Sequence, residues 1–150
     1  MGKRVVLGVG NLIMGDEGLG VRCVEWLDTR LPADVVAIDG GTSTNELLGD
    51  LEYLDLLVIV DAIVSNREPG SIVRLEGDRI PSAFSNKLSP HQHGINDLLA
   101  NLALLDRSPA RVVLLGVVPK TIALGLELSP EIASVIPVVG QLVLDELAVT

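Results

Sequence analysis

Five short aliphatic runs, separated by turns and helical patterns, constrain the fold of this 150-residue chain more than any other feature. Each run has the length of a strand and is apolar at nearly every position, which is typical of strands buried on both faces of a sheet. The predicted strands are residues 4–9, 34–38, 56–60, 71–75 and 111–118. Because helical patterns alternate with most of them, the sequence predicts an α/β fold with a mostly parallel sheet.

Four helices are predicted around these strands. The first begins near Asp16 and runs toward residue 31, where Pro32 follows, and the last contains Pro137 and Gly140, which predict a kink or an interruption. The predicted helices cover residues 16–31, 44–51, 94–105 and 131–149. With helices on both faces of the sheet, the fold class is a three-layer α/β/α arrangement.

One connection is too short for a parallel crossover. Only nine residues, with the turn sequence Glu68-Pro69-Gly70 among them, separate Asp61 from Ser71. A parallel crossover needs about a dozen residues or more. We therefore expect residues 71–75 to form an antiparallel strand at the edge of a twisted five-stranded sheet. The length of the chain predicts that residues 1–150 form a single domain.

Composition excludes several classes of partner. With 48% hydrophobic and 21% charged residues the chain can bury a core. One Trp, one Tyr, one Phe and a net charge of −9 argue against nucleic acid, because there is little to stack on bases and the charge repels phosphates. A single cysteine allows no internal disulfide, so a reducing cytoplasm fits best.

A membrane span is not expected either. The longest apolar stretch, residues 132–144, is interrupted by polar and helix-disfavouring residues. It is also shorter than the roughly 20 apolar residues that a spanning helix requires. We therefore predict a cytoplasmic protein without a membrane span.

Acidic residues follow three of the predicted strands, at the sheet edge where α/β proteins bind their ligands. Glu17 follows the glycine-rich turn after the first strand, Asp39 ends the second and Asp61 ends the third. Asp61 alone would be interpreted as a structural cap, and Asp16 as compensation of a helix dipole. If the first and third strands are neighbours, as in the flavodoxin-like order, the Glu17 and Asp61 carboxylates meet at one crevice.

A nucleotide site at the same turn is a weaker interpretation. The pattern Gly8-Val9-Gly10 resembles the start of a dinucleotide-binding turn, but Ile13 stands where the third glycine belongs. The following helix then opens with two carboxylates, which would repel a pyrophosphate.

The two histidines, His91 and His93, are predicted in a polar loop before the third helix. Residues two apart share a side only in an extended segment, so we expect one ion to take one of them. Two carboxylates and one imidazole form a mixed oxygen and nitrogen site that suits a divalent first-row ion. The usual zinc-protease, serine-hydrolase and aspartic-protease motifs are absent from the sequence, and Cys23 is interpreted as a core residue.

Four segments in order resemble those of the nickel-iron hydrogenase maturation endopeptidases, and the resemblance runs from end to end of the chain. They are Gly8-Val9-Gly10-Asn11 through Asp16-Glu17, Asp39-Gly40-Gly41-Thr42, Val60-Asp61-Ala62 and Asn86-Lys87-Leu88-Ser89-Pro90-His91-Gln92. The resemblance implies a single-domain hydrolase that removes the C-terminal peptide of a hydrogenase large-subunit precursor after nickel insertion. It also implies that the turn with Gly40 and Gly41 lies near the site.

The metal-contacting positions of that family fall on Glu17, Asp61 and His91, so the resemblance implies that these three are the catalytic and metal-ligating residues. His91 is preferred to His93 because it occupies the Ser-x-His-Gln position. The nickel is expected to be carried by the substrate rather than held tightly by the free protein.

Two other functions use the same residues or the same turn. A non-proteolytic nickel-binding chaperone or sensor of the large subunit would use the same three ligands, and a nucleotide-binding regulator would use the glycine turn. For the protease, the residues leave open whether nickel polarises the scissile carbonyl or activates a water, or whether a carboxylate acts as base.

Overall fold

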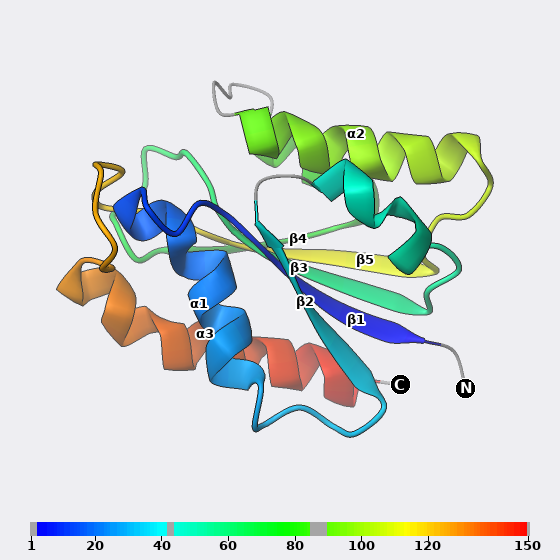
Figure 1. Cartoon of the computed structure of the whole chain (residues 1–150), viewed down its shortest axis with the longest axis horizontal. Helices are drawn as coiled ribbons and strands as arrows, with labels where there is room; N and C mark the ends of the chain where they lie inside the picture. The colour runs from blue at the N-terminus through cyan, green and yellow to red at the C-terminus, as the bar shows by residue number, and fades with distance from the viewer. Residues whose placement is uncertain (1–2, 42–43, 85–89, 150) are drawn as a thin grey trace.

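A computed structural model shows a five-stranded sheet with helices on both faces (Figure 1). It describes residues 3–41, 44–84 and 90–149, and the side chains of all of these except 44–46, 83–84 and 90–94. The strands are β1 (Arg4–Val9), β2 (Val35–Gly41), β3 (Leu56–Ala62), β4 (Ile72–Glu76) and β5 (Arg111–Val117). The α-helices are α1 (Leu19–Leu27), α2 (Pro90–Leu104) and α3 (Pro130–Ala148), and the 3₁₀ helices are η1 (Gly15–Gly18), η2 (Thr44–Asp50) and η3 (Gly77–Phe84).

The strands lie in the order β2-β1-β3-β5-β4. The first four in that order pair in parallel, whereas β4 pairs antiparallel with β5, with Ile72 opposite Val117 and Glu76 opposite Val113. The mostly parallel sheet with one antiparallel edge strand confirms the predicted fold class. The order also makes β1 and β3 neighbours, which is the condition for the carboxylates after these two strands to share one crevice.

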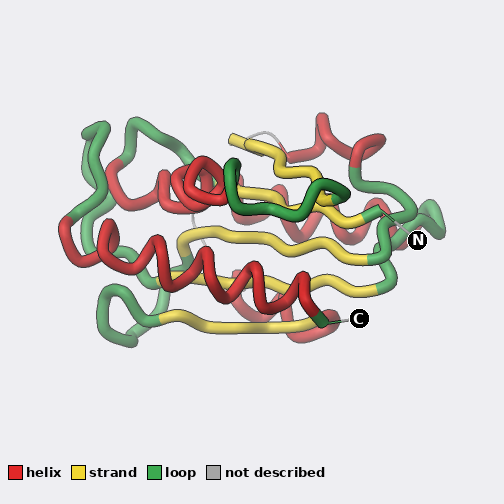
Figure 2. The backbone as a smooth tube through the Cα atoms, turned by 90° about the horizontal axis from the view of Figure 1, so that it is seen from below, coloured by secondary structure: helices red, strands yellow, loops and turns green. Residues whose placement is uncertain are grey.

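The core has two halves, one on each face of the sheet. Successive side chains of a strand point to opposite faces, so Val6 packs with α1 and α3 while Val5 and Leu7 pack beneath α2. Figure 2 looks at the molecule from the side of α3, which lies in front of the strands. These two layers fix the strand ends on which the candidate site is built.

Helix boundaries differ from the prediction more than strand boundaries do. The first helix begins as the 3₁₀ turn η1 and its α-helical part ends at Leu27, and the predicted second helix is the 3₁₀ helix η2. The predicted third helix begins at Pro90 rather than Gly94, so the prediction that His91 and His93 lie in a loop is wrong. Proline is favoured at the first position of a helix, which explains the earlier start.

The expected interruption of the last helix is also absent, because α3 is continuous over Pro130–Ala148. Pro137 lies on its exposed side, where the carbonyl left without a donor can be hydrated. Gly140 faces α1, and a Cβ atom there would lie 2.3 Å from ring atoms of Trp26. The glycine therefore permits the close approach of α3 to α1 rather than ending the helix.

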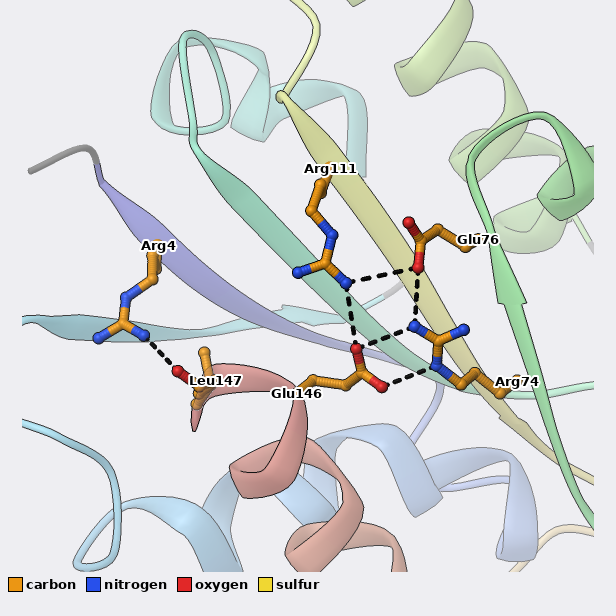
Figure 3. A network of polar contacts seen from close by, with 6 residues as sticks. All are labelled: Arg4, Arg74, Glu76, Arg111, Glu146 and Leu147. Atoms are coloured by element: carbon orange, nitrogen blue, oxygen red, sulfur yellow. Dashed lines mark hydrogen bonds and ion pairs between the residues drawn. The ribbon is translucent and has the colours of Figure 1, made fainter. Parts of the chain in front are cut away.

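A cluster of ion pairs fixes the end of α3 to the edge of the sheet (Figure 3). Arg74 on β4 contacts both oxygens of Glu146, at 2.7 and 3.0 Å, and Glu76 at 2.7 Å. Arg111 on β5 lies 3.4 Å from both Glu76 and Glu146. The hydrogen bonds from Arg74 lower the pKa of the Glu146 and Glu76 carboxyls, so both glutamates stay ionised.

Candidate functional site

Asp61 lies at the carboxyl end of β3, a strand whose residues are all buried. The side chain itself is fully buried, and its Oδ1 accepts a hydrogen bond of 2.8 Å from the backbone N–H of Ala62. In the parallel register, Val60 lies opposite Gly8 of β1. The Asp61 carboxylate is therefore next to the point where β1 leads into its glycine-rich turn.

Glu17 belongs to η1, which packs against β3, and only 9% of the residue is exposed. Two glycines permit this placement. A Cβ atom at Gly10 would lie 1.8 Å from the carbonyl oxygen of Glu17, and one at Gly20 would lie 2.3 Å from that of Val60. The start of α1 thus rests on the backbone ends of β1 and β3, and Glu17 and Asp61 share one edge of the sheet.

Asp16, the neighbour of Glu17, has a structural role. Its buried carboxylate accepts hydrogen bonds from the backbone N–H groups of Lys120, Thr121 and Ser129 at 2.7–2.9 Å, and from the Ser129 hydroxyl at 2.8 Å. Burial alone would raise the pKa of Asp16, but these hydrogen bonds outweigh it and the pKa lies below the ordinary value. Asp16 therefore holds the β5–α3 connection against η1.

The contacts of Asp16 could not be found from the sequence. The expectation that Asp16 is structural rather than catalytic agrees with these hydrogen bonds, but helix-dipole compensation is not the main reason. Its partners lie 104 to 113 positions further along the chain, and they are mostly backbone groups that any residue could supply.

The end of β2 adds a shallow hollow of about 220 Å³ beside the same edge. Asp39 lines it, is exposed, and accepts a hydrogen bond of 2.9 Å from the N–H of Gly41. The carbonyl of Gly41 in turn accepts one of 2.8 Å from Gly10. The described part of the Asp39-Gly40-Gly41-Thr42 turn thus lies near the site, as the resemblance implied, while Thr42 is outside the described residues.

The predicted third ligand is only partly placed. His91 and His93 belong to the first turn of α2, but their side chains, and residues 86–89 before them, are outside the described part of the chain. Among the described side chains, no three His, Cys, Asp or Glu groups gather closely enough to hold one ion. The structure therefore places two members of the predicted ligand set, Glu17 and Asp61, at one sheet edge.

Two further expectations concern residues away from this edge. Cys23 is fully buried in α1, and burial raises the pKa of its thiol to about 12, which confirms a core residue rather than a nucleophile. Within residues 3–41, 44–84 and 90–149, no helix combines the length and the apolar character needed to cross a bilayer.

Comparison with known proteins identifies one family. Residues 21–146 match the family model described as hydrogenase maturation protease. The chain is 43% identical to the hydrogenase 2 maturation protease of Escherichia coli (strain K12) over 135 residues, covering 88% of this chain and 82% of that protein. It is 41% identical to the hydrogenase expression/formation protein HupD of Rhodobacter capsulatus over 118 residues, covering 77% of this chain but 56% of that longer protein.

Solved structures give the same picture. The hydrogenase maturating endopeptidase HybD from E. coli superimposes with a TM-score of 0.92 at 40% identity, covering 97% of this chain and 91% of that one. The [NiFe] hydrogenase maturation protease HybD from Thermococcus kodakarensis has a TM-score of 0.81 at 28% identity, covering 97% and 99% of the two chains. Both superpositions cover nearly the whole chain, which therefore shares the fold of these two proteases.

Proposed function

Because the chain belongs to the hydrogenase maturation protease family, and is by that membership a peptidase, we propose that it removes the C-terminal peptide from the precursor of a nickel-iron hydrogenase large subunit. Cleavage follows the insertion of nickel into that precursor. The observation that carries this proposal is the pair of almost inaccessible carboxylates, Glu17 and Asp61, at the edge where β1 and β3 end.

In this proposal, Glu17, Asp61 and His91 contact the nickel that the substrate brings with it. Carboxylate and imidazole donors can bind a divalent first-row ion and leave coordination positions open, unlike the closed thiolate sites that hold structural zinc. Nickel bound in the substrate would either polarise the scissile carbonyl or activate a water, and the alternative is a carboxylate that acts as the base. Because the ion arrives with the substrate, the three side chains respond to whether the precursor has been loaded.

The contributions of the two described carboxylates differ. The Ala62 N–H fixes one oxygen of Asp61, so this carboxylate presents its charge in a set orientation. Glu17 is positioned through the backbone of η1, which Asp16 ties to the β5–α3 connection. Pre-oriented groups lose little freedom when substrate binds, which favours both ion recognition and proton transfer to or from a water.

The experiment is to incubate the purified protein with nickel-loaded precursor and to weigh the large subunit by mass spectrometry. A mass decrease equal to a C-terminal peptide supports proteolysis. An unchanged mass, together with measurable binding of the loaded precursor, would instead favour a nickel-binding chaperone or sensor.

Variants then assign the residues. We expect Glu17→Gln, Asp61→Asn and His91→Gln each to abolish processing without changing the circular dichroism spectrum. The control variant His93→Leu should still process the precursor. If His93→Leu removes activity and His91→Gln does not, the histidine assignment is inverted. If all three ligand variants still process the precursor, the proposed site is wrong.

A further inference from the structure

Four large aliphatic side chains are exposed on two loops beside η1. They are Ile13, Ile122, Leu124 and Leu126, with exposed fractions of 50%, 43%, 81% and 66%. We call this set the apolar platform. Single exposed aliphatic residues are common on protein surfaces, but a group on adjacent loops is typical of an interaction site.

The two loops of the platform are joined by backbone hydrogen bonds. The N–H of Gly125 donates to the carbonyl of Ile13 at 2.8 Å, and the N–H of Gly15 donates to the carbonyl of Gly125 at 2.9 Å. Met14 and Gly125 form an isolated parallel β-bridge. Figure 1 shows the β5–α3 connection next to the start of α1, as these contacts require.

The platform backbone is also fixed at its ends. Asp16 holds the connection at Lys120, Thr121 and Ser129, and Arg22 donates a hydrogen bond of 3.1 Å to the carbonyl of Leu126. The exposed aliphatic side chains thus project from a backbone that hydrogen bonds fix in place. A surface that is ordered before binding loses less conformational entropy when a partner docks.

The chemistry of the platform indicates the kind of partner. Residues 11–14 and 121–126 contain no charged side chain, although the whole chain carries a net charge of −9. An apolar loop could also insert into a membrane, but this net charge repels anionic lipid. A protein with an apolar surface is therefore the better match.

The position of the platform indicates which protein. Gly15 bonds to Gly125 and Asp16 bonds to Thr121, so the platform is continuous with the turn that carries Glu17. Any polypeptide that reaches Glu17 and Asp61 must pass this edge of the sheet. We propose that the apolar platform binds an apolar surface of the same precursor whose C-terminal segment is cleaved, an inference that rests on the proposed function.

The test compares Leu124→Gln, alone and with Leu126→Gln, with the matched control Leu104→Gln. Leu104 is 84% exposed, against 81% for Leu124, but it ends α2 at the opposite end of the fold (Figure 1). Calorimetry measures the Kd for the nickel-free precursor, and steady-state kinetics with loaded precursor measure kcat and KM. Thermal unfolding midpoints confirm that all variants are folded.

We expect the double variant to raise Kd and KM about tenfold or more while kcat changes less than about twofold, and Leu104→Gln to change neither. An unchanged Kd, or an equal loss in Leu104→Gln, overturns the proposal. The proposal is also overturned if the double variant loses self-association in sedimentation while its Kd for the precursor is unchanged. The same holds if it loses binding to phosphatidylglycerol vesicles while that Kd is unchanged. If the wild-type protein binds precursor but never shortens it, the proposed function fails while Kd still tests the platform.

Discussion

The two ends of the sheet hold their carboxylates in different ways. At the end where β4 finishes and β5 begins, Glu76 and Glu146 pair with the guanidinium groups of Arg74 and Arg111 in partly exposed positions. At the opposite end, Asp16 is fully buried and is held by backbone N–H groups and one hydroxyl.

The difference has a consequence for the site. A guanidinium cancels the charge of its partner, whereas a backbone N–H stabilises a carboxylate without adding a formal charge. Asp16 therefore stays negative beside Glu17, at the edge that also carries Asp61. Such an arrangement favours the approach of a cation, while the ion pairs at the other end fix α3 to the sheet.

The largest effect on stability is expected from Asp16→Ala. It leaves three partly buried N–H groups without their acceptor, which should lower the free energy of unfolding by about 3 kcal/mol. Ser129→Ala, the control, removes one hydroxyl donor and should cost about 1 kcal/mol. Urea unfolding measures both; a loss below about 1 kcal/mol for Asp16→Ala would contradict the structural role.

The contribution of Asp16 should also appear in the pH dependence of the free energy of unfolding. The pKa of Asp16 is lower in the folded protein than in the unfolded chain, so the unfolded chain binds more protons in acid. Its contribution is present above the unfolded pKa of about 4 and is lost as the pH falls through the lower folded value. We expect Asp16→Asn to lose less stability than the wild type on acidification below pH 4, measured by urea unfolding. Parallel curves for the two proteins would refute this assignment.

A smaller loss is expected at the other end of the sheet. Arg74→Gln breaks the contacts with Glu146 and Glu76, and because Arg74 is 45% exposed the cost should be about 1 kcal/mol. Arg67→Gln, an exposed residue of the β3–β4 connection, removes the same charge and should cost less than about 0.5 kcal/mol. Equal losses for the two variants would show that net charge, and not the paired geometry, is responsible.

The smallest expected effect is a difference in salt dependence between the variants at the two ends of the sheet. In about 1 M salt the screening length falls to roughly 3 Å, so the destabilisation caused by Arg74→Gln should shrink by a few tenths of a kcal/mol. The destabilisation caused by Asp16→Ala should stay constant, because the carboxylate is buried and its hydrogen-bond partners carry no charge. Repeating the urea titrations at low and high salt checks this; a strong salt dependence at Asp16 would remove the contrast.

The strands follow from the sequence because burial on two faces demands aliphatic runs, whereas aliphatic runs do not determine the strand order. The predicted and observed limits of β1 coincide, at Arg4–Val9. The position of Glu17 and Asp61 at strand ends follows from the same pattern. Helix starts are harder, because a 3₁₀ turn such as η1 and an α-helix share their local signals, and Pro90 was interpreted as part of a loop.

What the sequence could not reveal depends on contacts between distant segments. Gly140 predicts a helix interruption in the sequence, whereas in the fold it makes room for the ring of Trp26. The apolar platform was hidden for the same reason, since only the folded β5–α3 connection shows which of its aliphatic residues face outward.

A Cβ atom at position 20 would lie 2.3 Å from the carbonyl oxygen of Val60, so α1 and β3 approach each other closely beside Glu17 and Asp61. A single methyl group at position 20 acts as a wedge between helix and sheet, displacing Glu17 relative to Asp61 while both side chains stay unaltered. Processing by a Gly20→Ala variant therefore measures how strongly the proposed activity depends on the separation of Glu17 and Asp61.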